Sequence, residues 1–320
     1  MTLTTLKEKV LDGYTVQRDD VAVLLAADDT ALCDAANEIR AHFCGSAFDL
    51  CTIVNGKSGK CSENCKYCAQ SSFYKTCAEE YPLLSTDELK KQADYNAQKG
   101  ILRYSVVTSG KRLTKAEVDT LCESYRTMHQ TCDILLCASH GLLDEEDFAK
   151  LAAAGVVRYH NNLETSRRNF PNICTTHTYD DKIAAIKAAQ KAGLAVCSGG
   201  IMGLGETMDD RIDMAFDLRA LGVHSVPLNI LNPIPGTPFE HLPILSEQEM
   251  CRIVAIFRFI LPDAALRMAG GIGLLADAGK SVFCSGANAA ISGDMLTTAG
   301  VSIDTDIRMV TALGFEVKTL

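Results

Sequence analysis

Short apolar runs alternate with longer amphipathic segments along most of the chain. The runs have the length and apolar character of buried strands. We expect seven strands and a weaker eighth near Ala289–Ile291, the seven being Asp49–Val54, Arg103–Thr108, Ile134–Ala138, Val156–His160, Ala195–Ser198, Ser225–Ile230 and Ala265–Met268. Helical periodicity marks the segments between them, Ser85–Lys99, Lys115–His129, Glu145–Ala154, Tyr179–Ala192, Met208–Leu221 and Ser246–Leu261.

This order of elements predicts the fold class. Strand and helix alternate every 25–40 residues or so, as parallel strands joined by crossover helices do. Seven or eight such units indicate an α/β fold, a (β/α)8 TIM-type barrel, rather than an open sheet. Residues 1–45 carry helical patterns and predict an N-terminal helical extension. Because no linker interrupts the chain, we expect one domain over residues 1–320.

Several polar residues and thiols fall where barrel strands end. Residues at the carboxyl ends of barrel strands are the ones expected to act on substrates. Cys137, the Asn161–Asn162 pair, Cys197 and Asn229 each lie at or near such an end. The pattern therefore gathers two thiols and three amides at one face of the predicted barrel.

Composition narrows the class of protein. The net charge of −9 and the lack of a dense basic patch argue against nucleic acid as a partner. No apolar stretch reaches the roughly 18–20 residues that span a bilayer, so we expect no membrane segment. Met1–Glu8 lacks a basic region followed by an apolar core, so we expect no signal peptide. Fourteen cysteines then fit a cytoplasmic, reducing location, with some thiols as metal ligands.

The most specific motif is the run Cys61-x3-Cys65-x2-Cys68. Three thiolates at this spacing can hold three irons of a [4Fe-4S] cluster and leave the fourth iron open, whereas electron-transfer clusters usually take four cysteines. A structural zinc loop is the alternative, and it needs a fourth ligand, for which Cys77 is the nearby candidate. The loop resembles that of radical S-adenosylmethionine (SAM) enzymes, which implies SAM bound at the open iron.

Further motifs extend the resemblance to one family. From about residue 40 to the C-terminus the chain is similar to the biotin synthase family, in segments that follow in the same order: Gly59–Ser71, Tyr159–Ser166, Val196–Thr207, Val226–Asn229, Gly236–Pro238, Leu266–Gly270 and Gly286–Asn288. The resemblance implies sulfur insertion into dethiobiotin, an auxiliary iron–sulfur cluster as the sulfide donor, and flavodoxin or ferredoxin as the reductant. It also allows a homodimer.

The resemblance assigns roles to single residues. Tyr67 matches a SAM contact, and Glu164 stands where the family usually has Asp for the SAM ribose. Asn162 and Asn229 match the pair that binds the ureido ring of dethiobiotin, and Asn162 is also a SAM contact. His160 and Lys182 are weaker substrate candidates.

The auxiliary site departs from the family pattern at one position. Cys137, Cys197 and Arg267 match three of the expected ligands, but Ser105 stands where a cysteine is usual. Cys51 lies on the first predicted strand and faces the same side as Ile53, because alternate residues of a barrel strand point inward. Our hypothesis is that Cys51, Cys137 and Cys197 hold the auxiliary cluster with Arg267 close by, either a four-iron type or the usual [2Fe-2S]. A buried core thiol is the alternative role for Cys51.

Two other kinds of protein stay open at this point. One is a related radical SAM enzyme, of the hydrogenase-maturation or methylornithine-forming type, which shares the cluster loop but needs no sulfide donor. The other is a non-enzymatic iron–sulfur or zinc protein, which would not require amides at the strand ends.

Overall fold

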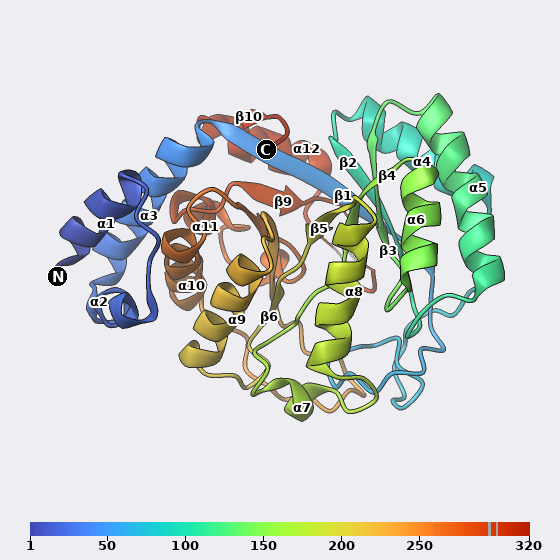
Figure 1. Cartoon of the computed structure of the whole chain (residues 1–320), viewed down its shortest axis with the longest axis horizontal. Helices are drawn as coiled ribbons and strands as arrows, with labels where there is room; N and C mark the ends of the chain where they lie inside the picture. Colours follow the sequence, from blue (N-terminus) through green and yellow to red (C-terminus); the bar gives the residue numbers. More distant parts are fainter. Residues whose placement is uncertain (294–295, 299) are drawn as a thin grey trace.

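A closed parallel sheet forms the centre of the computed structural model, which describes residues 1–293, 296–298 and 300–320 (Figure 1). β1 pairs with β2 on one side and with β9 on the other, and this second pairing closes the barrel. The described strands are β1 Ala47–Lys57, β2 Arg103–Thr108, β3 Leu135–Ser139, β4 Val156–His160, β5 Ala195–Cys197, β6 Gly200–Met202, β7 Ser225–Ile230, β8 Ala265–Met268, β9 Ala289–Ile291 and β10 Glu316–Val317.

Helices surround this sheet and connect its strands (Figure 1). They are α1 Leu3–Leu11, α2 Val21–Ala26, α3 Asp29–Cys44, α4 Thr86–Gln98, α5 Lys115–Thr131, α6 Glu145–Ala153, α7 Phe170–Ile173, α8 Tyr179–Lys191, α9 Met208–Ala220, α10 Glu247–Ile260, α11 Lys280–Cys284 and α12 Ile303–Ala312, with short 3-10 helices at Arg18–Asp20 and Ile272–Leu274. The predicted (β/α)8 barrel and its helical extension are confirmed, including the weak eighth strand.

One barrel position is split where the sequence predicts a single strand. The expected strand Ala195–Ser198 ends at Cys197, and β6 resumes at Gly200 against the same neighbour, β7. Gly199 lies between the two pieces, and a Cβ placed there would be 1.9 Å from the carbonyl oxygen of Pro227. Only glycine allows this approach of two backbones, so the break is built into the sequence.

Several crossover helices begin with the same kind of N-terminal cap. Ser85, Thr114, Thr178 and Thr207 each accept a hydrogen bond from the third residue of the helix that follows, and the acidic side chain of that residue reaches back to the cap backbone. These capping boxes satisfy amide groups that would otherwise lack partners. They fix the points where α4, α5, α8 and α9 leave the loops of the barrel.

The N-terminal helices pack on one side of the barrel, next to α10 and α11 (Figure 1). Arg252 of α10 reaches the last carbonyls of α2, those of Leu24 and Leu25, and pairs with Asp29 of α3. The extension is therefore attached by polar contacts as well as by its apolar faces. In the described part of the chain no helix is both long and apolar enough to cross a membrane.

Candidate active site

Alternate residues of the barrel strands face one cavity of about 400 Å³. Cys51 and Ile53 of β1 line it, as do Arg103 and Ser105 of β2. Tyr104, between the last two, points outward, and its hydroxyl donates to a carbonyl of α4. The inward position expected for Cys51 follows from this alternation.

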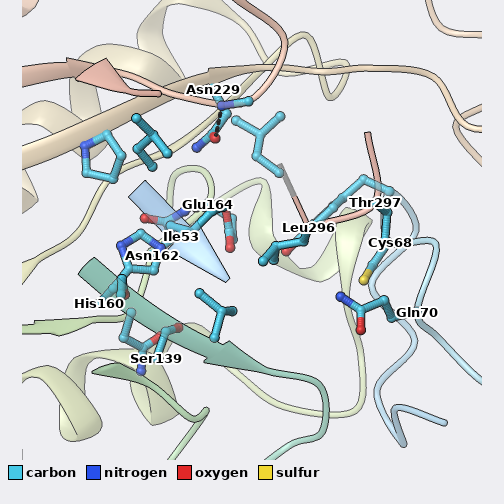
Figure 2. A pocket seen from close by; sticks show the side chains of 18 of the residues that line it. Ile53, Cys68, Gln70, Ser139, His160, Asn162, Glu164, Asn229, Leu296 and Thr297 are labelled. Atoms are coloured by element: carbon cyan, nitrogen blue, oxygen red, sulfur yellow. Dashed lines mark hydrogen bonds between the residues drawn. The ribbon is translucent and has the colours of Figure 1, made fainter. Parts of the chain in front are cut away.

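Loops after the strands complete the walls of the cavity. Figure 2 shows His160, Asn162 and Glu164 on one side, and Cys68 and Gln70 of the cysteine loop on another. The cavity thus brings together residues that the sequence places about 100 positions apart.

The loop between β1 and α4 carries the three predicted cluster cysteines. Its backbone closes on itself, because Cys61 N–H donates to the Gln70 carbonyl (3.0 Å) and Ser72 N–H donates to the Cys61 carbonyl (2.9 Å). Cys61 and Cys68 line the cavity. Burial raises the pKa of the Cys68 thiol to about 11, and the charges of Cys61 and Glu164 act in the same direction.

Cys65, the third cysteine of the loop, has other neighbours. Its sulfur lies within 4.8 Å of the Cys174 sulfur and a ring nitrogen of His177. The loop therefore presents two thiols to the cavity and one to the segment after α7.

Three further thiols enter the barrel from alternate strands. Cys51 of β1, Cys137 of β3 and Cys197 of β5 are buried and line the same cavity as the loop. Arg267 of β8 donates from Nη1 to the Cys51 sulfur (3.2 Å), and the Ser225 hydroxyl donates to the Cys197 sulfur (3.3 Å). Cys51 precedes the end of β1 by six residues, so these thiols lie deeper than the cysteine loop.

Cys51, Cys137 and Cys197, here called the deep thiols, differ in how easily they ionise. Burial raises the pKa of Cys51 to about 12 and that of Cys137 to about 11. Burial also raises the pKa of Cys197, but a hydrogen bond and the charge of His160, together with the charge of Arg267, outweigh it and bring that pKa down to about 6. Cations close to the thiols favour the thiolates that iron requires.

A buried carboxylate holds two of the cations in place. Asp49 accepts from Nη2 of Arg267 (2.6 Å) and from Nε of Arg103 (3.0 Å). Burial raises the pKa of Asp49, yet the charges of Arg267 and Arg103 outweigh this effect and hold it well below its usual range. The sequence interpretation did not identify Asp49 and Arg103, whose ion pairs hold Arg267 beside the Cys51 thiol. Charged residues inside an apolar strand pattern were the available signal.

The predicted amide pair is fixed by backbone contacts. The Asn229 side chain donates to the Gly200 carbonyl (3.0 Å) and accepts from Gly270 N–H (2.9 Å). Asn162 accepts from Gly199 N–H (3.1 Å) and donates to Glu164 (3.3 Å). Both side chains therefore hold one orientation at the cavity wall.

Glu164 has an uncommon backbone. Its φ is 70°, in the left-handed region that non-glycine residues rarely adopt. Its N–H donates to the Gly199 carbonyl and its carbonyl accepts from Ile201 N–H, so the neighbouring strand maintains the strain. Burial, and the charge of Glu164, raise the pKa of Tyr67 well above its usual value. Tyr67 and Glu164 are thus neighbours in the cavity.

Two buried donors of the cavity have no hydrogen-bond partner among the described residues. They are Nδ2 of Asn161 and Nε of Arg158. Buried donors are nearly always satisfied, so a bound acceptor fits here. Lys182 donates to the Asn161 side-chain oxygen (3.1 Å) and adds positive charge. The cavity therefore suits an anionic or carbonyl-bearing ligand.

Ser105 lies beside the deep thiols. In the β2–β3 register it pairs with Cys137, and in the β1–β2 register it pairs with Ile53. Cys51 is two residues before Ile53, so it is the next inward-facing side chain of β1 on the flank of β2. Cys51 and Ser105 are therefore diagonal neighbours on the inner surface of the barrel.

Two family models match consecutive parts of the chain. The model of the radical SAM superfamily matches residues 57–218, which include the cysteine loop, and that of the "Biotin and Thiamin Synthesis associated domain" matches residues 227–316. The first match covers half of the chain, and membership of that superfamily implies a [4Fe-4S] cluster and SAM as cofactors. The two cavity-lining thiols of the loop fit such a cluster.

Curated relatives decide the family. Biotin synthase of Akkermansia muciniphila is 61% identical over 319 residues, 99% of each chain. Biotin synthases of Brachyspira hyodysenteriae (56% identical, 99% of this chain and 96% of that one) and Clostridium botulinum (58% identical, 97% and 98%) match nearly as well. The chain belongs to the biotin synthase family.

Solved structures show how widely this barrel is shared beyond the biotin synthase family. Methylornithine synthase superimposes with a TM-score of 0.84 at 18% identity, over 98% of this chain and 97% of that one. A maturase of the [FeFe]-hydrogenase gives the same score and identity, over 98% and 74%. These likenesses show the fold alone. Membership of the biotin synthase family therefore separates this chain from the two radical SAM enzymes that were its alternatives.

Proposed function

We propose that this chain inserts sulfur into dethiobiotin to form biotin, with SAM as co-substrate. The observation that supports this proposal best is a single cavity with two tiers of thiols. Cys61 and Cys68 lie at its loop side, and Cys51, Cys137 and Cys197 lie deeper. A sulfur-inserting enzyme needs such an arrangement, because the substrate must reach a site of hydrogen removal and a sulfide at once.

In this proposal the loop holds the cluster and SAM. Cys61, Cys65 and Cys68 are the cluster ligands, and Tyr67, Asn162 and Glu164 contact SAM. A carboxylate at Glu164 can accept hydrogen bonds from both ribose hydroxyls. Together, the bound cluster and SAM supply the radical chemistry that removes hydrogen from an unactivated carbon.

Asn162 and Asn229 are proposed to bind the ureido ring of dethiobiotin. Each amide side chain offers a donor and an acceptor, as does the ring. Their backbone contacts fix them before the substrate arrives, which reduces the ordering required on binding. The unpartnered Nδ2 of Asn161 is a further donor at the same wall.

Cys51, Cys137, Cys197 and Arg267 are proposed to hold the auxiliary cluster, the donor of sulfide. Serine is a poor partner for iron among thiolates, so we assign the third thiolate to Cys51 rather than to Ser105. Three thiolates suit a four-iron cluster with one open iron. Arg103 and Arg158 line the same cavity and offset the negative charge of such a cluster.

The compartment is proposed on chemical grounds, and the reductant and assembly are proposed from the biotin synthase family. Free thiols and oxygen-sensitive clusters require a reducing compartment, so we assign the enzyme to the cytoplasm. We propose flavodoxin or ferredoxin as the reductant, a homodimer as the assembly, and one barrel domain over residues 1–320.

The activity is tested by anaerobic reconstitution with iron and sulfide. We expect the reduced protein to form 5′-deoxyadenosine from SAM and biotin from dethiobiotin, both measured by mass spectrometry. Mössbauer spectra should resolve two kinds of cluster. A reconstituted protein that forms no 5′-deoxyadenosine contradicts the proposal.

Cys51→Ala tests the auxiliary ligand set. The variant should lose the auxiliary Mössbauer signal, and its yield of biotin should fall by about tenfold or more, while SAM cleavage persists. Cys122→Ala, at a buried thiol on α5, is the matched control and should keep both. Full iron and sulfide content with full activity in Cys51→Ala would assign Cys51 to the core instead.

A further inference from the structure

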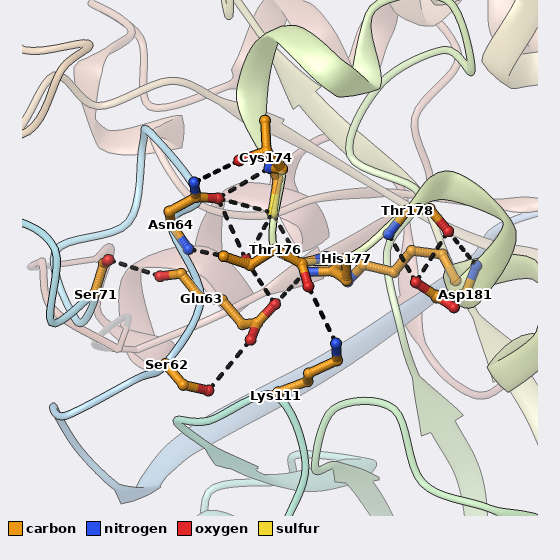
Figure 3. Close-up of polar contacts among 12 residues, drawn as sticks. Ser62, Glu63, Asn64, Ser71, Lys111, Cys174, Thr176, His177, Thr178 and Asp181 are labelled. Atoms are coloured by element: carbon orange, nitrogen blue, oxygen red, sulfur yellow. Dashed lines mark hydrogen bonds and ion pairs between the residues drawn. The ribbon is translucent and has the colours of Figure 1, made fainter.

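The segment after α7 is docked on the cysteine loop by a dense set of hydrogen bonds (Figure 3). Asn64 N–H donates to the Thr176 hydroxyl (3.1 Å), and the Asn64 side-chain oxygen accepts from Thr175 N–H (2.9 Å). Lys66 N–H donates to the Ile173 carbonyl (2.9 Å). Polar backbone and amide contacts therefore join the two segments.

The same interface holds a cluster of metal-binding side chains. The ligand atoms of Cys65, Cys174 and His177 all lie within 4.8 Å of one another. Cys174 and His177 are buried, and so is Glu63, whose Oε2 lies 2.6 Å from His177 Nδ1. Two thiols and an imidazole form the donor set of a site for a borderline-soft divalent cation, and the Glu63 carboxylate lies next to the imidazole.

We propose that, in the chain without its loop cluster, Cys65, Cys174 and His177 bind a single zinc(II) or iron(II) ion. The Glu63 carboxylate lies against the His177 ring and orients it. The thiol protons leave for solvent when the thiolates bind the cation.

The separation of Cys174 and His177 fits tetrahedral coordination. Ligands at a Zn–S distance of about 2.3 Å and a Zn–N distance of about 2.1 Å lie about 3.6 Å apart. The Cys174 sulfur and His177 Nδ1 are 3.3 Å apart. The same nitrogen faces Glu63, so a cation bound at Nδ1 takes the place of the proton between imidazole and carboxylate.

The position of Glu63 is also held from outside the site. Its Oε2 accepts from the Thr176 hydroxyl (2.8 Å), and its Oε1 accepts from the Ser62 hydroxyl (3.2 Å). Figure 3 shows these groups converging on the carboxylate. Such outer contacts fix ligand geometry in metal sites.

Because Cys65 is shared, the cation and the loop cluster exclude each other. This second statement rests on the proposed function, which makes Cys65 a cluster ligand, whereas the cation site itself does not. Iron(II) held here would lie beside the loop in which the cluster assembles. Zinc(II) held here would keep Cys65 from the cluster.

The site is tested in the full-length chain carrying Cys61→Ala and Cys68→Ala, which cannot hold the loop cluster. Anaerobic titration with cobalt(II) should show a site with sulfur-to-cobalt charge transfer that depends on Cys174 and His177, and zinc(II) should displace the cobalt from it. Adding Cys174→Ala or His177→Ala should weaken binding by about tenfold or more. X-ray absorption spectroscopy at the zinc edge should show one sulfur ligand fewer around zinc in the Cys174→Ala protein.

Two matched changes control for other thiols. Cys77→Ala, at an exposed cysteine after the loop, and Cys137→Ala, among the deep thiols, should leave this affinity unchanged. Circular dichroism melting confirms that each variant is folded. Equal affinity with and without Cys174, or a loss caused by Cys137→Ala instead, overturns the proposal.

The mutual exclusion of cation and loop cluster is measured separately, on the protein with all its cysteines. The cluster-loaded protein should take up no zinc at this site, and zinc added before reconstitution should lower the loop-cluster signal in electron paramagnetic resonance. If both are bound at full occupancy, the exclusion is wrong. The result of the cobalt titration does not depend on this outcome or on biotin formation.

Discussion

The guanidinium groups of Arg103, Arg158 and Arg267 reach the same cavity as the deep thiols. Arg103 and Arg267 are buried, and burying cations together is unfavourable unless anions are close. Asp49 supplies one anion in the described structure, and thiolates would supply more. At the residue scale, the positive charge of these guanidinium groups therefore favours the thiolate form of the deep thiols.

Asp49→Asn should destabilise the protein by about 3 kcal/mol at neutral pH, because it leaves Arg267 buried without its anion. The pKa of Asp49 is held well below its usual range. Its stabilisation is therefore complete above about pH 4 and is lost as the pH falls further. Urea unfolding measures the difference.

The control for this change is Asp144→Asn. Asp144 pairs with Arg112 and Lys115 on the surface, where such pairs contribute less than about 1 kcal/mol. An equal loss of stability in the two variants would show that burial of the Asp49 pair has no special effect.

At the scale of elements, described residues between β9 and α12 line the cavity. Leu296 and Thr297 line it, and the Leu296 carbonyl accepts from the Asn55 side chain (3.1 Å). At the base of the segment, Ser292 N–H donates to the Cys51 carbonyl (2.8 Å), and its hydroxyl donates to Asp306 of α12 (2.5 Å). Through Ser292, α12 is thus linked by hydrogen bonds to Cys51 in the wall of the active site.

Asp306→Asn should stabilise the protein at pH 8 by about 2 kcal/mol. Burial raises the pKa of Asp306 to about 6, so its contribution to stability is present below about pH 4 and is lost as the pH rises through 6. Asparagine keeps an acceptor for Ser292 without the charge. Unfolding free energies at pH 5 and pH 8 measure the effect.

Asp304→Asn, on the exposed side of α12, is the control for this pH dependence. Asp304 pairs with Lys99 at the surface, so its replacement should change stability little at either pH. A pH profile of Asp306→Asn identical to that of the unmodified protein would contradict the assignment.

At the scale of the whole molecule, the barrel depends on the N-terminal helices for part of its cover. Ile39 of α3 is fully buried, and α3 packs against α10. Ile39→Ala should therefore cost about 2–4 kcal/mol of unfolding free energy, while the iron content of the reconstituted protein is unchanged.

The matched control is Ile244→Ala, at an isoleucine whose relative exposure is 49%. It should change the unfolding free energy by less than about 0.5 kcal/mol. A similar small effect at Ile39 would mean that the extension is not part of the cooperative fold.

Most of the fold could be predicted from local pattern. The strands Arg103–Thr108, Val156–His160, Ser225–Ile230 and Ala265–Met268 have the predicted bounds, because each apolar run is closed by turn residues. β6 was missed, since three residues carry too little periodicity. β10 and α12, near the C-terminus, were also missed.

The sequence alone determined the barrel, the cysteine loop and the inward face of Cys51, because strand periodicity and motif spacing are local properties of a chain. Only the tertiary structure decided which distant side chains meet. It placed Arg103 and Asp49 against Arg267, and Cys174 and His177 against Cys65. Those contacts depend on strand register and on how loops dock, which no spacing within one segment encodes.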